Sequence, residues 1–423
     1  MIKKKAIAIF SVILLVFITG FAVVYNYLDT RLLENSIRIV RAQEGVFNSD
    51  IIPFPEGIEI ITEEEFMLTV EEEARELTDV HVRQYIEKFF NANNTTAEFF
   101  IGDALDERLV FACIDDYIYE RPEISARIYN VLFIGDDARI HQDRGRSNAM
   151  ILLSYNRDTR IISLTSFMRD ILVPINPDGT YWNRLNSMHA TGGPGRTINL
   201  INRLFSLNIQ RYVAVRFSGV FELVDALGGL ELELTGAEAA VINRIFPDFD
   251  PVCEGLNHLN GRQVLAYSRM RVIDSDFVRT QRQRYVMRAI IDKILDTTNI
   301  SDIFTLAAFA LDHVETNIPL NEILTIVWDM FSGSRPVIEE LRIPVVGSFN
   351  HGLYYGAYIL IIDFTENITA LHKHVYGSAA GARIPNFTLP YITQPIQTAG
   401  NGEFFSAKQD NQTEKQQTAN RGY

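Results

Sequence analysis

The stretch Ile128–Ile134, IYNVLFI, is an almost unbroken apolar run, and Gly135, Asp136 and Asp137 follow it directly. A run of this length and composition predicts a strand that is buried on both faces of a sheet. In α/β sheets, ligands gather beyond the carboxyl ends of the strands. The polar residues after Ile134 therefore predict a binding loop at a sheet edge.

The sequence on either side of this strand predicts a sheet that is covered by helices. Met150–Tyr155 and Ile161–Phe167 are two more apolar runs, with a turn expected at Arg157–Arg160. Further strands are expected at 212–215 and 230–234, and near 341–345 and 353–360. Helices are expected at 196–205, 219–227, 236–245, 261–269, 277–295, 301–313 and 320–331. Strands mixed with helices in this order predict an α/β sandwich with helices on both faces of the sheet.

The N-terminus has the pattern of a membrane anchor. Lys3, Lys4 and Lys5 precede an uncharged stretch, Ala6–Leu28. A helix of about 20 apolar residues crosses a bilayer, and the lysines favour a cytoplasmic N-terminus. The run exceeds the apolar core of about 7–15 residues in cleaved signals, so we expect an uncleaved, single-pass signal anchor in the cell membrane. A cleaved signal peptide is the alternative.

Composition divides the rest of the chain. Residues 29–126 hold 23 acidic and 8 basic residues, which is typical of an acidic accessory domain or stalk, and the tail 377–423 is expected to be flexible. Between them, residues 127–376 form the predicted main domain, which is expected to be extracytoplasmic. Residues 127–300 hold 21 basic and 18 acidic residues, and 20 of the basic residues are arginine. This near balance and the formal net charge of −14 argue against nucleic-acid binding.

Arginine in this amount favours a phosphate or carboxylate ligand, because guanidinium offers a planar fork of donors and keeps its charge. Arg146 precedes the second strand, Arg169 follows the third, and Arg279 and Gln283 lie one helical turn apart. Clustered arginines repel one another unless an anion lies among them, and pyrophosphate would relieve that repulsion. The alternatives are a structural Arg169–Asp170 pair and, at Arg282, Arg284 and Arg288, a solvated helix face.

Two other residue types suggest no chemistry. Cys113 and Cys253 form no CxxC pair, so we expect two buried free thiols, with a disulfide as the alternative. His189 has no obvious partner in the sequence and is expected to be structural.

Taken together, these motifs resemble the LytR–CpsA–Psr family over roughly residues 128–296. The matching order is GDDAR, RSN, SFMRD, NRLNSMHATGGPGRTINLINRLF, FSGVFELVDALGGLELEL, GLNHLNGRQVLAYSRMR and SDFVRTQRQR. The resemblance implies an α/β/α sandwich with a central mixed sheet behind an N-terminal transmembrane helix. It also implies transfer of a glycopolymer, such as teichoic acid or capsule, from undecaprenyl pyrophosphate to peptidoglycan at the cytoplasmic membrane.

The resemblance also implies roles for individual residues. The pyrophosphate would be surrounded by Arg139, Arg146, Arg169, Arg184, Arg269, Arg271, Arg279 and Gln283. Asp276 would position or deprotonate the acceptor hydroxyl, so Asp276, Arg279 and Arg169 are the expected catalytic residues. An apolar groove between the sheet and the helices at 196–205 and 219–227 would hold the lipid tail.

The same resemblance makes Asp137 the first ligand of Mg²⁺, with Mn²⁺ as an alternative. Asn148 stands where the family usually has aspartate, and its amide oxygen can still ligate a hard cation but lacks the charge. This predicts weaker metal binding, with compensation by a neighbour such as Asp136 as the alternative. Two other functions stay open: a pyrophosphatase with water as acceptor, and a non-catalytic lipid- or glycan-binding protein of the envelope.

Overall fold

The computed structural model describes residues 38–41, 52–53, 58–62, 117–120, 128–137, 144–175, 181–271, 273–296, 314–378, 382 and 387–388. The expected membrane anchor, most of residues 29–126, Cys113, Arg139, the helix expected at 301–313 and most of the tail lie outside these ranges. Within them, no helix combines the length and apolar character that a membrane crossing requires.

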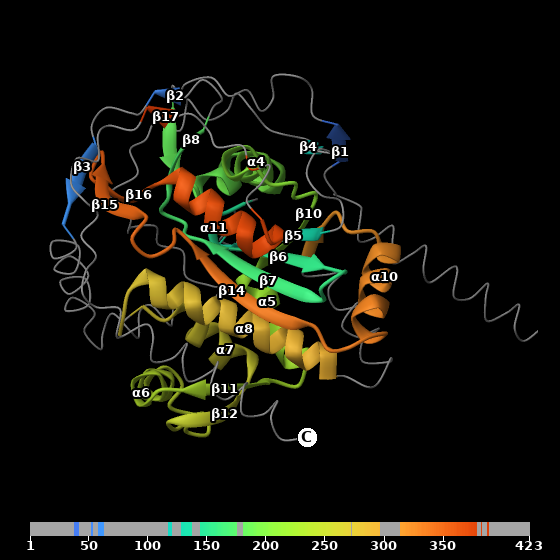
Figure 1. Ribbon diagram of the computed structural model, residues 1–423. Helices are drawn as coiled ribbons and strands as arrows, with labels where there is room; N and C mark the ends of the chain where they lie inside the picture. Colours follow the sequence, from blue (N-terminus) through green and yellow to red (C-terminus); the bar gives the residue numbers. More distant parts are fainter. Residues whose placement is uncertain are drawn as a thin grey trace, which may run out of the picture.

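A six-stranded mixed sheet lies at the centre of the described structure (Figure 1). Its strand order is β13 (Val314–Thr316), β10 (Arg211–Arg216), β5 (Ile128–Asp136), β6 (Ser147–Asn156), β7 (Ile161–Phe167) and β14 (Val337–Ile343). The pairs β5–β10 and β7–β14 are parallel, and the other neighbours are antiparallel. The predicted α/β fold with a central mixed sheet is confirmed.

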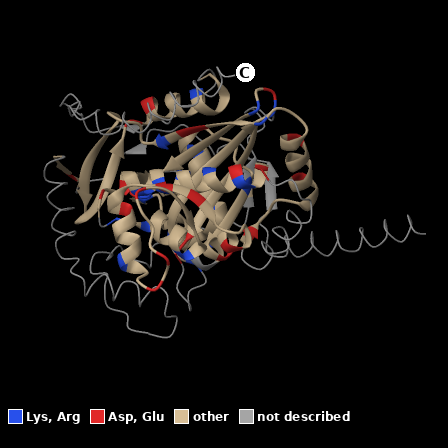
Figure 2. Ribbon diagram, turned by 90° about the horizontal axis from the view of Figure 1, so that it is seen from below, with Lys and Arg blue, Asp and Glu red and all other residues tan. Residues whose placement is uncertain are grey.

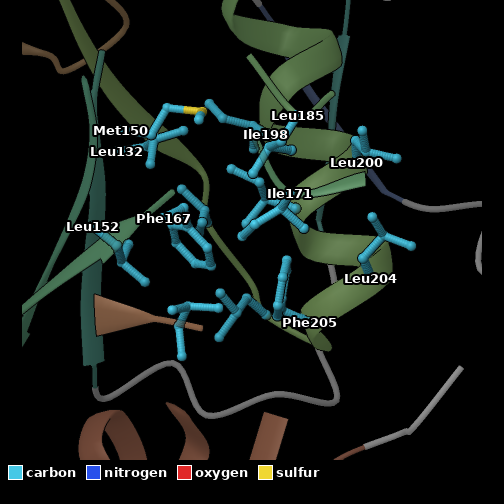
Figure 3. Close-up of a cluster of buried hydrophobic side chains, with 14 of the residues drawn as sticks. Leu132, Met150, Leu152, Phe167, Ile171, Leu185, Ile198, Leu200, Leu204 and Phe205 are labelled. Atoms are coloured by element: carbon cyan, nitrogen blue, oxygen red, sulfur yellow. The ribbon is translucent and has the colours of Figure 1, made fainter. Parts of the chain in front are cut away.

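Helices cover both faces of this sheet, with α4 (Ser187–Phe205) and α11 (Phe364–Tyr376) on one side and α8 (Asp276–Asp296) on the other (Figure 1). On the first side, Leu132, Leu152 and Phe167 of the sheet face Ile198 and Phe205 of α4 (Figure 3). On the opposite side, alternate strand residues pack against α8. Burial on both faces explains why these strands are apolar along nearly their whole length.

Four more helices complete the described set. They are α5 (Phe217–Ala226), α6 (Gly236–Ile245), α7 (Gly261–Arg269) and α10 (Leu320–Phe331). Helices α6 and α7 both begin at capping boxes, Thr235 with Glu238 and Asn260 with Gln263. Each box satisfies backbone N–H groups at the first turn, so these helices begin at the residues that the sequence predicts.

The first helix of the domain is longer than predicted. It was expected from 196, but α4 already begins at Ser187 and contains a kink at Gly193. Gly193 has a φ of 68°, and a Cβ there would lie 1.6 Å from Nη1 of Arg144. The glycines of the Gly-Gly-Pro-Gly sequence allow the Arg144 side chain to lie close to the backbone. Because glycine and proline disfavour helix, the sequence gives no sign of the first turns of α4.

The strand expected near 353–360 was wrong. Those residues form the two arms of a hairpin, β15 (Phe349–Tyr354) and β16 (Ala357–Ile362), which pairs with β3 (Ile58–Ile61) outside the central sheet. The turn residues Tyr355 and Gly356 have φ values of 49° and 76°. Such a turn requires two left-handed residues, and a tyrosine gives no sign of it in the sequence.

Several elements were not predicted. They are α11, β8 (Leu172–Pro174), β9 (Trp182–Arg184), β12 (Gly255–Leu259), β13, and the short pairs β1 (Arg38–Arg41) with β4 (Tyr117–Glu120) and β2 (Ile52–Pro53) with β17 (Phe387–Thr388). Strand β12 pairs with the predicted β11 (Leu230–Leu234). The expected burial of Cys253 was also wrong, because this free thiol is exposed.

Candidate anion-binding site

The candidate site lies at one edge of the central sheet. Strands β5, β7, β10 and β14 run in the same direction and end there, and β6 begins there. Asp137 follows β5, Asn148 is the second residue of β6 and Arg169 comes two residues after β7. Helix α8 begins with Asp276, whose carboxylate contacts Arg169. The sheet edge thus brings together residues that are far apart in the sequence, up to the 139 positions between Asp137 and Asp276.

Asp276 gathers three guanidiniums. Its carboxylate oxygens lie 2.8 Å from Nη2 of Arg279, 3.4 Å from Nε of Arg169 and 3.5 Å from Nε of Arg271. Burial alone would raise the pKa of Asp276, but the neighbouring guanidiniums, Arg169 foremost, hold it below the usual value. Asp276 therefore stays ionised at neutral pH.

Arg169 links this carboxylate to a second one. Its Nε also lies 3.2 Å from Oδ2 of Asp170, and Nη1 of Arg184 lies 3.5 Å from Oδ1 of the same residue. Two backbone hydrogen bonds hold this segment in place: the backbone N–H of Asn186 donates to the Arg169 carbonyl, and the backbone N–H of Leu360 donates to the Asp170 carbonyl. The Arg169–Asp170 pair expected as a structural alternative exists, but it is part of the larger cluster.

Asp137 and Asn148 extend the cluster towards β5 and β6. The Asp137 carboxylate accepts hydrogen bonds from the Arg146 backbone amide at 2.6 Å and from Nδ2 of Asn148 at 2.7 Å. The Asn148 Oδ1 accepts from Nη1 of Arg169 at 3.3 Å. Burial raises the pKa of Asp137, while the Arg146 hydrogen bond and the nearby charge of Arg269 oppose that rise.

The cluster carries more positive than negative charge. The arginines that act on these carboxylates are Arg146, Arg169, Arg184, Arg269, Arg271 and Arg279. The carboxylates are Asp136, Asp137, Asp170 and Asp276. Figure 2 shows basic and acidic segments intermingled across the middle of the described structure, in keeping with these ion pairs.

Arg279 is a buried arginine of this cluster with an unsatisfied hydrogen-bond donor. Its side chain is 6% exposed, and its Nε is buried with no hydrogen-bond partner. The pKa of Arg279 is lowered to about 9, chiefly by burial; the charge of Asp276 opposes this shift, and the charges of Arg169 and Arg271 contribute to it. A buried donor without a partner is costly, so an anionic ligand that accepts from it would stabilise the site.

Three other arginines of α8 lie outside the site. Arg282, 3% exposed, donates to Glu238 of α6 at 2.7 Å and also pairs with Asp274. Arg284 and Arg288 pair with Glu340 of β14. The solvated helix face expected here is therefore wrong for Arg282 and Arg284, which are buried and pair with other elements of the fold. Gln283 is half-buried, one helical turn after Arg279.

Residues that the sequence analysis missed form an aromatic group beside the cluster. Phe277 contacts Phe349 and His351, with ring centroids 5.3 and 6.2 Å away, and Nδ1 of His351 hydrogen-bonds the Tyr358 hydroxyl at 2.6 Å. Burial raises the pKa of Tyr358, and the charges of Asp170 and Asp276 raise it further. The mispredicted β15–β16 hairpin carries three of these four rings, so no sequence signal placed them here.

Two further groups adjoin the site. The Arg342 guanidinium lies 4.5 Å from the centre of the Phe277 ring, and burial, followed by the charge of Arg284, lowers its pKa to about 10. His189 is 1% exposed, and its Nε2 lies 3.5 Å from Oδ2 of Asp136. The histidine expected to be structural is therefore next to the binding loop.

The oxygen atoms around Asp137 are not arranged to ligate a divalent cation. Mg²⁺ requires about six oxygen ligands in octahedral geometry. Both Asp137 oxygens accept N–H groups, and the Asn148 oxygen faces a guanidinium. Within the described ranges, no group of three or more His, Cys, Asp or Glu side chains could hold a metal ion. The magnesium ligands Asp137 and Asn148 remain a prediction.

Known proteins resemble both the sequence and the fold. A teichoic acid transferase of Bacillus subtilis (strain 168), TagV, is 28% identical over 209 residues, which are 47% of this chain and 52% of TagV. Biofilm regulatory protein A of Streptococcus mutans is 31% identical over 46% of this chain and 50% of its own length. The chain thus spans about half the length of these two relatives.

A third relative is covered more fully. TagU of B. subtilis, a polyisoprenyl-teichoic acid–peptidoglycan teichoic acid transferase, is 30% identical over 54% of this chain and 72% of its own length. Among solved structures, TagT bound to LIIa-WTA shares the fold with a TM-score of 0.50 at 23% identity, covering 61% of this chain and 96% of that one. The model of the LytR_cpsA_psr family matches residues 118–370, more than half of the sequence. The chain therefore belongs to the LytR_cpsA_psr family.

Proposed function

We propose that this chain transfers a glycopolymer from an undecaprenyl-pyrophosphate carrier to peptidoglycan, outside a membrane in which residues 1–28 anchor it. The observation that carries the proposal is the buried surplus of guanidinium groups around Asp276, with the Arg279 Nε unsatisfied. A pyrophosphate supplies the negative charge and the acceptor oxygens that this cluster lacks. The names of the relatives TagV and TagU support the choice of lipid-linked donor and peptidoglycan acceptor.

The chemistry would be a phosphoryl-type transfer. The acceptor hydroxyl oxygen forms a bond to the phosphorus that carries the glycan, and the bond from that phosphorus to the bridging oxygen breaks. Polyprenyl phosphate leaves, and the glycan retains one phosphate. Arg169 and Arg279 stabilise the charge that builds on the leaving phosphate, since donors fixed in advance need no reorganisation during the reaction.

Asp276 would orient the acceptor. Because its guanidinium neighbours keep the pKa of Asp276 low, the carboxylate can accept a hydrogen bond from a sugar hydroxyl at neutral pH. The hydroxyl proton is drawn towards Asp276 as the new P–O bond forms. No step is assigned to a metal, because the donors at Asp137 do not fit one.

The apolar layer of Figure 3, between the sheet and α4, lies on the side where we expect the lipid tail to enter. The part of the predicted groove at 219–227 is less favoured, because Val224 of α5 belongs to a different core, together with α6, α7 and β11.

The test is transfer from a purified lipid-linked glycan to peptidoglycan by the full chain in detergent. Arg279→Ala should abolish transfer. Arg288→Ala, on the same helix but paired with Glu340 and Asp292, should retain it. Transfer by Arg279→Ala at the rate of the unmodified chain would refute the assignment of the phosphate site. Release of free phosphoglycan in place of a wall-linked product would identify a pyrophosphatase.

A further inference from the structure

The polar contacts of Asn148 connect Asp137 to the arginine cluster. Its Nδ2 donates to Asp137 Oδ2 at 2.7 Å, and its Oδ1 accepts from Arg169 Nη1 at 3.3 Å. Reversing the amide would set its NH₂ against a guanidinium and its oxygen against a carboxylate. The neighbours therefore determine which end of the amide faces which group.

This contact occupies one of the two oxygens that Asp137 could offer to a cation. The other carboxylate oxygen already accepts the Arg146 backbone amide at 2.6 Å. Asp136, the adjacent carboxylate, accepts the Gly145 backbone amide at 2.8 Å and lies beside His189. The carboxylates of Asp136 and Asp137 thus already accept N–H groups, and a divalent ion would compete with these hydrogen bonds.

The charge of the site also changes with this residue. An aspartate at 148 would set two carboxylates against each other at hydrogen-bonding distance, and such a pair needs a proton or a cation between them. An asparagine needs neither, because its N–H supplies positive partial charge to Asp137. Its oxygen remains available to orient Arg169, which contacts Asp276.

We infer that the Asn148 amide takes the place of a divalent cation at Asp137, so that this chain binds pyrophosphate without Mg²⁺. The inference rests on the proposed function, since it assumes that pyrophosphate is the ligand. Asn148 is then a positioning residue: it acts on the phosphate through Arg169.

The experiment uses the full chain in detergent, with inorganic pyrophosphate as the probe and calorimetry as the readout. The dissociation constant is measured in EDTA and in Mg²⁺. For the unmodified chain we expect the two values to agree within about threefold, less than 1 kcal/mol. Asn148→Asp should bind at least about tenfold more weakly in EDTA than in Mg²⁺, which corresponds to about 1.4 kcal/mol.

Asn156→Asp is the matched control, because it makes the same change at the far end of β6, where Asn156 Oδ1 accepts the Asp158 and Thr159 amides. It should behave like the unmodified chain. A second readout is Mn²⁺ binding by electron paramagnetic resonance without pyrophosphate: Asn148→Asp should gain one site over both other proteins. The acidic residues 29–126 are common to all three and cancel in that comparison.

The two proposals fail in different ways. If the unmodified chain needs Mg²⁺ for at least about a tenfold gain in pyrophosphate affinity, the present inference is overturned and the proposed function stands. If it binds no pyrophosphate in either buffer, both are overturned. Either outcome is decided by the unmodified chain alone, so a misfolded variant would not obscure it.

Discussion

Replacing Asp276 by asparagine should lower the stability of the protein without a ligand and raise its affinity for anions. The substitution removes the carboxylate that Arg169, Arg271 and Arg279 share, at 3.4, 3.5 and 2.8 Å. Asp276→Asn nearly preserves the side-chain volume, so the principal change is the loss of one negative charge among three positive ones.

The magnitude follows from burial. The side chains of Asp276, Arg279 and Arg169 are 9%, 6% and 18% exposed, whereas that of Arg271 is 46% exposed. Breaking a buried pair by removing one partner costs about 3–5 kcal/mol, and solvent screening makes the Arg271 contact worth much less. The asparagine can still accept a hydrogen bond, so we expect a loss of about 3 kcal/mol in the free energy of unfolding.

Inorganic pyrophosphate should reverse most of this loss. With one positive charge more in surplus, Asp276→Asn should bind the anion more tightly than the unmodified chain. A ligand at 100 times its Kd stabilises the folded state by about 2.7 kcal/mol. The assay is urea unfolding of the full chain with and without pyrophosphate, beside Asp292→Asn as a control at a half-exposed ion pair on the same helix.

Two results would refute the reasoning. One is an Asp276→Asn protein as stable as the unmodified chain, which would mean that the guanidiniums do not depend on this carboxylate. The other is weaker pyrophosphate binding by the variant, which would mean that Asp276 helps to hold the anion and does not compete with it.

Three further predictions concern groups inside and outside the site. The pKa of Asp276 is lowered in the folded protein, so the stability that its ionised form contributes is fully present above the ordinary aspartate pKa of about 3.9 and is lost as pH falls below it. The free energy of unfolding, measured against pH, should show this loss, and Asp276→Asn should not. Glu238→Gln leaves the buried Arg282 with one carboxylate fewer and should lower the free energy of unfolding in urea by about 3 kcal/mol. A change in pyrophosphate affinity would contradict the structural role given to this pair. Gly193→Ala places a side chain on backbone that essentially only glycine adopts, with φ 68° and ψ −165°, and against Arg144. It should cost more than the roughly 1–3 kcal/mol of the backbone strain alone. Adding Arg144→Ala should recover only the excess, and full recovery in thermal unfolding would argue against the strained backbone.

Local sequence signals predicted five of the six strands of the central sheet and most of the helices in the described part of the chain. Strand β7 and helix α7 begin and end at the expected residues, because a buried strand shows as an apolar run and a capping box marks the first turn of a helix. The arginines and Asp276 were also identified in advance, and the structure brings all but the undescribed Arg139 and the unconnected Gln283 to one sheet edge.

Contacts between distant segments could not be predicted in this way. The aromatic group depends on a hairpin that turns at Tyr355, a residue with no turn preference, and on its packing against Phe277 of α8. The contacts of Asn148 could not be predicted for a related reason. An amide can offer its oxygen to a metal, but only the positions of Asp137 and Arg169 determine which end of the amide faces which neighbour.

Helix α8 belongs to two hydrophobic cores, since Met287 and Ile291 pack on the central sheet while Val286 and Tyr285 pack with α6, α7 and β11. Its first residue is the carboxylate on which three guanidiniums converge. A change in the tilt of this one helix would therefore disturb both cores and the guanidinium cluster together.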